Sequence, residues 1–179
     1  MLIATNPYSG EKIESFPCLS KHEMYARIGE ASAAYADWSD RSFEERGEVL
    51  RAVARQLRAE KHDLAQLMAL EMGKPIREGV PEVEKAAFCA EFYADNAEKF
   101  LARDTIESDA SLSYVCYQPL GTLLGILPWN APLWLAFRYL APALMAGNTC
   151  VMKHDPHVPQ TAQAIANAFV KAGAPENIM

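Results

Sequence analysis

Apolar and polar positions repeat with two different periods along this chain, and each change of period marks a boundary between predicted elements. Residues 3–19 carry short alternating apolar pieces on either side of Asn6-Pro7-Tyr8-Ser9-Gly10, a turn sequence that predicts a β-hairpin. Apolar residues at helical spacing continue from there to residue 102. They predict four helices, which begin near Ser20, Ser42, His62 and Pro75.

Local signals define the ends of these helices. Ser20 with Glu23, and Ser42 with Glu45, form capping boxes, and Gly73 ends the third helix. In the fourth helix, Pro81 predicts a kink or a restart. The predicted inner positions of the four helices are, in order, Met24, Ile28, Ala31, Tyr35 and Trp38; Leu50, Val53, Ala54 and Leu57; Leu64, Leu67, Met68 and Glu71; and Val83, Ala87, Ala90, Phe92 and Tyr93.

Strand-like alternation returns between Thr105 and Tyr117, around an Asp109-Ala110-Ser111 turn. This pattern predicts a second hairpin with one face in water. An isolated hairpin is only marginally stable in water, so we expect it to pair with another surface. In this chain the expected partner is another subunit.

The last third of the chain changes period again. Gly121–Leu127 is a continuous apolar run, as in a parallel strand buried on both faces, and Leu133–Ala146 is apolar all round, as in a buried helix. Thr149–Lys153 predicts a second buried strand, Pro159–Ala172 an amphipathic helix, and residues 176–179 the approach to a third strand. The β-α-β-α order predicts an α/β fold with parallel pairing and right-handed crossovers.

A membrane helix is the alternative interpretation of the run from Leu120 to Phe137, which carries no charged side chain. The prolines, glycines and polar residues within and just beyond the run argue against it; they are Gly121, Gly125, Pro128, Asn130, Pro132, Arg138 and Pro142. A strand, a loop and a helix explain the segment better.

The composition narrows the classes of function. The chain has 179 residues, a net charge of −6 and no basic stripe, which argues against a nucleic-acid partner. Its four cysteines are widely spaced, and Cys150, with apolar neighbours, is interpreted as an inert core thiol. Without a secretory signal pattern, reduced thiols predict a cytoplasmic protein.

Asn130 is the most conspicuous polar residue, because it lies in an apolar segment between Pro128 and Pro132. Its amide can donate a hydrogen bond to a developing oxyanion. Alternatively, it caps the following helix, which is a far commoner role for asparagine and is the interpretation favoured by the residues alone.

Other polar residues near the predicted strands also have two interpretations. Lys153 ends the second strand on the side of a parallel sheet where ligands bind, or it is a solvated lysine. Arg138 binds an anion, or it extends to the surface. His154, Asp155 and His157 crowd one loop but have no fourth ligand, so no metal site is predicted.

Motifs in an ordered series along the chain resemble the aldehyde dehydrogenase superfamily, and within it the succinate-semialdehyde dehydrogenase group. The matching segments are Asn6-Pro7-x-x-Gly10-Glu11, Glu71-Met72-Gly73-Lys74-Pro75, Glu82-Val83, Pro119-Leu120-Gly121, Pro128-Trp129-Asn130-x-Pro132, Pro142-Ala143-Leu144-x-Ala146-Gly147-Asn148 and Lys153. The resemblance implies the N-terminal part of that fold. Residues 1–103 would form an N-terminal hairpin and helices, 104–118 an oligomerisation-type hairpin, and 119–179 an incomplete Rossmann-like NAD(P)-binding β-α-β-α unit, with the catalytic domain absent.

The resemblance also implies roles for individual residues. Asn130 matches the asparagine of the oxyanion hole, which replaces the capping interpretation, and Arg138 matches an arginine that binds the distal carboxylate of the substrate. Ile126, Leu127, Pro128 and Trp129 match residues that line the nicotinamide cofactor site, and Lys153 matches a lysine that bonds the adenosine ribose.

Departures from the family pattern limit the expected activity. Ala131 replaces an aromatic residue, and Pro156 replaces an acidic residue that often selects NAD, so NAD and NADP both remain candidates. The Gly-rich phosphate turn and the segments carrying the catalytic glutamate and cysteine are missing. The resemblance therefore implies part of an NAD(P)-dependent dehydrogenase for an aldehyde, with succinate semialdehyde the expected substrate and this chain inactive alone. The alternative is a non-catalytic module that binds full-length subunits through residues 105–117.

Overall fold

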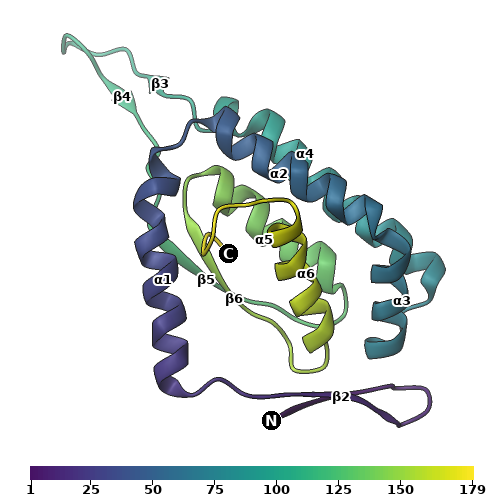
Figure 1. Cartoon of the computed structure of the whole chain (residues 1–179). Helices are drawn as coiled ribbons and strands as arrows, with labels where there is room; N and C mark the ends of the chain where they lie inside the picture. Colours follow the sequence, from purple (N-terminus) through teal and green to yellow (C-terminus); the bar gives the residue numbers. More distant parts are fainter.

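Two parallel strands, β5 (Thr122–Ile126) and β6 (Thr149–Lys153), lie at the centre of the chain, and α5 (Pro132–Met145) makes the crossover between them. The computed structural model describes residues 1–179 and places this sheet between α1 (Lys21–Asp40) on one side and α5 with α6 (Pro159–Lys171) on the other (Figure 1). The predicted β-α-β-α order and parallel pairing are confirmed.

Three further helices pack around this unit: α2 (Phe43–Ala59), α3 (Lys61–Met72) and α4 (Ile76–Phe100). The face of α2 predicted to be inward is fully buried against α4, and α4 packs in turn along α5. Trp38 of α1 joins the same core and donates from Nε1 to the carbonyl oxygen of Leu144 at 3.0 Å. The helices and the sheet therefore share one hydrophobic core.

The predicted helix ends agree with the structure. Both capping boxes form, with the backbone N–H of Ser20 and of Ser42 donating to the carboxylates of Glu23 and Glu45 at 2.7 Å. Gly73 ends α3 with φ of 75°, in the left-handed region where glycine carries no steric cost. The restart considered at Pro81 is absent, because α4 continues through that residue.

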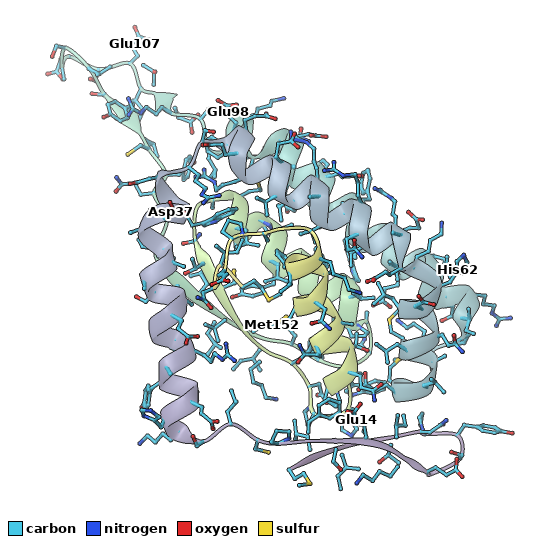
Figure 2. All side chains as sticks on the ribbon, in the orientation of Figure 1. Glu14, Asp37, His62, Glu98, Glu107 and Met152 are labelled. Atoms are coloured by element: carbon cyan, nitrogen blue, oxygen red, sulfur yellow. The ribbon has the colours of Figure 1, made fainter.

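Two hairpins extend from the helical body. The first pairs β1 (Leu2–Thr5) with β2 (Lys12–Phe16), and the second pairs β3 (Asp104–Thr105) with β4 (Tyr114–Val115). The second hairpin projects away from the other elements, with Glu107 near its tip (Figures 1 and 2). Both predicted hairpins are thus confirmed. None of the helices is both long and apolar enough to cross a bilayer.

The prediction that β5 is buried on both faces is wrong, since Leu124 is 64% and Ile126 71% exposed. Side chains alternate between the faces of a strand. Gly125 packs under the ring of Tyr139 from α5, so Leu124 and Ile126 point to the α1 side. There α1 touches the sheet at Ala31, whose carbonyl oxygen accepts from Thr149 Oγ1 at 2.9 Å, and it leaves the carboxyl end of β5 uncovered.

Two predicted helix faces are also buried less than expected. In α1, Ala31 and Trp38 are buried, but Met24 and Ile28 are exposed, because they lie before the point where the helix meets the sheet. In α4, Phe92 is exposed beside Phe88 and Phe100 rather than inward.

Residues near the end of the chain lie beside β6, on the edge opposite β5. The backbone N–H of Cys150 donates to the carbonyl oxygen of Ile178 at 2.9 Å, and Ile178 is buried. These residues do not form a regular strand. Their position agrees with the predicted approach to a third strand.

The contact between Gly125 and Tyr139 generates a stability prediction. A Cβ at position 125 would lie 2.5 Å from the ring of Tyr139, so we expect Gly125→Ala to lower the free energy of unfolding by about 1–3 kcal/mol. Gly29→Ala is the matched control, because nothing lies near that position on α1 and a helical alanine should stabilise by about 0.5–1 kcal/mol. Urea denaturation compares the two variants, and equal stabilities would contradict this packing.

Candidate functional site at the carboxyl ends of β5 and β6

The parallel register brings three of the predicted cofactor residues together. Ile126 pairs with Lys153 at the last position of the sheet, and the backbone N–H of Leu127 donates to the carbonyl oxygen of Lys153 at 3.1 Å. The side chains of Ile126 and Lys153 are exposed, so this edge is open to a ligand.

The loop after β5 carries the remaining predicted cofactor residues and the predicted oxyanion donor. Pro128, Trp129 and Asn130 are all exposed. The ring of Trp129 lies 6.4 Å from the ring of His157, between centroids, which places it beside the loop that follows β6. The loops after the two strands thus meet at one end of the sheet, the end where open parallel sheets bind ligands.

Asn130 does not cap α5, so the interpretation favoured by the residues alone is wrong. The N-cap residue is Ala131, and no side chain at that position bonds to the first turn. The Asn130 amide forms no hydrogen bond within the chain and is exposed. Its donor N–H groups are therefore free for a ligand.

Glu82 of α4 caps α5 in its place. Its Oε1 accepts from the backbone N–H groups of Leu133, at 3.0 Å, and Trp134, at 3.2 Å. The carboxylate is buried, with 8% of the residue exposed, and forms an ion pair with Lys74. A buried carboxylate at a helix N-terminus satisfies unpaired donors and complements the helix dipole.

Glu71 of α3 caps α6 in the same way. Its carboxylate accepts from the backbone N–H groups of Gln160, at 2.6 Å, and Thr161, at 2.9 Å, and from Thr161 Oγ1 at 2.8 Å. Burial raises the pKa of Glu71, although these hydrogen bonds act to lower it. Both helix N-termini, which bind phosphates in many nucleotide-binding folds, are thus occupied by carboxylates.

The loop after β6 is ordered by its own hydrogen bonds. The backbone N–H of Asp155 donates to His154 Nδ1 at 3.1 Å, which leaves the proton on Nε2, 3.2 Å from the carbonyl oxygen of Pro132. Burial lowers the pKa of His154, so the ring is neutral. Burial also acts to raise the pKa of Asp155, but hydrogen bonds from His157 outweigh it and lower that pKa.

His154 thus connects the loop after β6 to the first residue of α5. The sequence offered two interpretations of this histidine, a metal ligand or an ordinary polar residue of the loop, and neither includes its contact with Pro132. Glu71 was predicted at an inner position of its helix, but the capping roles of Glu71 and Glu82 were missed; the available signal was an acidic residue within a run of buried positions.

Arg138 reaches the surface of α5. Its Cζ lies 5.7 Å from the centroid of the Trp134 ring, and its guanidinium forms no ion pair within the chain. The side chain extends into solvent, as the surface interpretation expects, and it is also unpaired, as an anion-binding role requires.

The buried thiols do not provide a nucleophile. Burial raises the pKa of Cys150 to about 12 and also raises the pKa of Cys89, whose Sγ donates to the carbonyl oxygen of Phe137 at 3.6 Å. Both are protonated at neutral pH, which confirms Cys150 as a core thiol. Cys18 and Cys116 are exposed, and they lie outside the β5–α6 segment.

A parallel β-α-β unit with exposed polar groups at the carboxyl ends of its strands is typical of α/β enzymes that bind nucleotide cofactors. Comparison with known families is more specific. The model described as "Aldehyde dehydrogenase family" matches residues 2–179, and the chain belongs to that family.

Individual relatives agree with this assignment. The chain is 45% identical over 177 residues to a probable succinate-semialdehyde dehydrogenase [NADP(+)] of Synechocystis, and 42% identical over 180 residues to succinate-semialdehyde dehydrogenase [NADP(+)] 1 of Mycobacterium tuberculosis. Each alignment covers 98% of this chain and 39% of the relative. The chain therefore spans about two fifths of the length of these proteins.

Solved structures match this chain over a similar share of their length. A succinic semialdehyde dehydrogenase from Streptococcus pyogenes in complex with NADP+ superposes with a TM-score of 0.95 and 31% identity, covering 99% of this chain and 39% of that one. The protein Gox0499 superposes with a TM-score of 0.96 and 34% identity, covering 99% and 40%. The predicted fold, the N-terminal part of the aldehyde dehydrogenase fold, is confirmed.

The cap at α5 generates a second prediction. Glu82→Ala leaves two N–H groups of the first turn of α5, one of them buried, and Lys74 without a partner, so we expect the free energy of unfolding to fall by about 3 kcal/mol. Glu98→Ala is the control, because Glu98 is exposed near the end of the same helix (Figure 2) and its loss should change stability by less than about 0.5 kcal/mol. A Glu82→Ala variant as stable as Glu98→Ala would refute the cap.

Proposed function

We propose that this segment is the N-terminal part of an NADP- or NAD-dependent aldehyde dehydrogenase that oxidises succinate semialdehyde to succinate, with NADP the favoured cofactor. The relatives named above and the solved Streptococcus pyogenes complex support the substrate and the cofactor. The observation that carries the proposal is the free Asn130 amide at the open end of the sheet, between two prolines that restrict its loop.

Asn130 supplies the oxyanion donor in this proposal. When a nucleophile adds to the aldehyde carbon, negative charge develops on the carbonyl oxygen, and the Asn130 N–H groups donate to it. The resemblance implies a cysteine nucleophile and a thiohemiacetal, which loses its hydride to become a thioester that water hydrolyses to succinate and the free thiol. We place that cysteine outside residues 1–179, because Cys89 and Cys150 are buried and protonated and Cys18 and Cys116 lie outside this part of the fold. The segment alone is then inactive.

Ile126, Leu127, Pro128 and Trp129 form part of the cofactor wall, and Lys153 donates to the adenosine ribose. The bound cofactor supplies the oxidising power by accepting the hydride of the aldehyde carbon. Its phosphates bind away from the starts of α5 and α6, because Glu82 and Glu71 occupy those helix ends. Position 156 is proline, so no carboxylate at that position repels the 2′-phosphate of NADP. The nearby Asp155 carboxylate is hydrogen-bonded to His157, which also favours acceptance of that phosphate.

Arg138 binds the distal carboxylate of the substrate. Side chains of a helix lean toward its N-terminus, so Arg138 leans over Trp134 and toward Asn130. Arg138 lies one helical turn after Trp134, and Asn130 lies in the loop immediately before α5, so the proposed carboxylate and aldehyde contacts come from neighbouring parts of the chain.

The second candidate is a non-catalytic module that associates with full-length dehydrogenase subunits. The observation that favours it is the projecting hairpin, where Ile106, Leu112, Tyr114 and Tyr117 are exposed together with both strands. Exposed apolar side chains and unpaired strand edges are a surface for strand pairing. Co-purification with a longer homologue that is lost when residues 105–117 are deleted would support this candidate.

The catalytic proposal predicts the effect of removing the amide. Residues 1–179 are joined to the part of the Synechocystis relative that this chain does not match, and turnover is measured as NADPH absorbance with succinate semialdehyde. We expect Asn130→Ala to lower kcat by about 100- to 1000-fold, because one oxyanion donor is lost.

Asn167→Ala is the control, because Asn167 is exposed on α6, and its activity should match the parent. A kcat for Asn130→Ala within threefold of the parent would contradict the proposed role. The same assay on the unjoined 179-residue chain should give no NADPH above background, and clear turnover would show that the segment is active alone.

A further inference from the structure

Two cations lie against one aromatic ring on the outer side of α4 and α5. Lys85 Nζ of α4 lies 4.0 Å from the centroid of the Trp134 ring, and Arg138 Cζ of α5 lies 5.7 Å from the same centroid. Both residues are exposed, and neither forms an ion pair with an acidic side chain of the chain. This cluster of Lys85, Trp134 and Arg138 is called the cation cluster below.

The packing of the two helices fixes the cation cluster. Helices α4 and α5 run in the same direction where they pack. Glu82 accepts from the backbone N–H groups of Leu133 and Trp134, and Cys89, further along α4, contacts the carbonyl oxygen of Phe137, further along α5. Lys85 lies one turn after Glu82, so it meets Trp134. Burial raises the pKa of Cys89, and the charges of Arg138 and Lys85 both act to lower it.

Several other lysines near these helices are neutralised by carboxylates. Lys61 pairs with Glu84, Lys74 with Glu82, and Lys171 with Glu60. Lys85 has no such partner, and it is held instead by the face of an indole ring, which attracts a cation but leaves its charge uncompensated. Two uncompensated cations beside one ring repel each other, and a bound anion near both reduces that cost.

We propose that Lys85 is a second specificity-determining residue, which binds the remote carboxylate of the substrate together with Arg138, while Trp134 positions both cations. This rests on the function proposed above, and it adds a residue from α4 to a site otherwise built on α5. Asn130 lies in the loop before α5, and the N-terminal lean of Arg138 carries its guanidinium toward that end of the helix.

The test compares two aldehydes in the joined enzyme described above. Succinate semialdehyde carries the remote carboxylate, and butanal has the same chain length without it. We expect Lys85→Gln to lower the ratio of kcat/KM for succinate semialdehyde to kcat/KM for butanal by about fivefold, mainly through KM, as for one partly exposed ion pair. Lys99→Gln removes the same charge from the same helix, far from Trp134, and should leave the ratio unchanged.

Direct binding gives a readout that needs no turnover. Succinate is titrated into the 179-residue chain, and the indole N–H signal of Trp134 is followed by NMR, with that of buried Trp38 as the internal reference. We expect succinate to shift the Trp134 signal, and Lys85→Gln to weaken the apparent affinity by about fivefold while Lys99→Gln does not.

The outcomes separate the two proposals. Turnover of succinate semialdehyde with an unchanged substrate ratio in Lys85→Gln would overturn the role of Lys85 and leave the dehydrogenase function standing. A second outcome is a joined enzyme that folds but oxidises neither aldehyde, while succinate still binds in a way that depends on Lys85. That outcome would overturn the proposed function and retain the anion site. If Lys85→Gln changes neither the affinity for succinate nor the ratio of kcat/KM for the two aldehydes, the cation cluster is excluded as a carboxylate site.

Discussion

Two buried carboxylates fix the parallel unit to the helices around it. Glu82 of α4 holds the first turn of α5, and Glu71 of α3 holds the first turn of α6, through five hydrogen bonds to N–H and O–H donors. Without them, the starts of both helices would leave unsatisfied donors at the edge of the core, a cost of the order of 1–3 kcal/mol for each buried group. Because these contacts join residues far apart in sequence, the position of α5 and α6 depends on α3 and α4.

The same two carboxylates determine which groups remain available for a ligand. They close the two helix ends that would otherwise attract phosphate, and they release Asn130 from the capping role that its sequence position suggests. The open groups are then the Asn130 amide, the exposed ends of β5 and β6, and the cations on the outer side of α5. In the proposed function, these are the groups that would contact the aldehyde and its remote carboxylate.

Features governed by neighbours in sequence could be predicted, and features governed by tertiary neighbours could not. The capping boxes at Ser20 and Ser42 and the buried face of α2 depend on residues three or four positions apart, and the structure confirms them. The exposure of Ile126 and the cap from Glu82 depend on which helix covers which surface, which no local pattern contains. For the site, the resemblance supplied the roles of Asn130 and Arg138, which remain predictions, whereas Lys85 emerged only from its contact with Trp134.

Residue-resolved amide hydrogen exchange of the 179-residue chain tests the central claim most directly. If Glu82 and Glu71 cap α5 and α6, the first-turn amides of Leu133, Trp134, Gln160 and Thr161 should exchange at least about 100-fold more slowly than those of His62 and Asp63, at the start of α3, which has no side-chain cap. Equal exchange at the three helix starts, in a chain whose core amides are protected, would contradict the account.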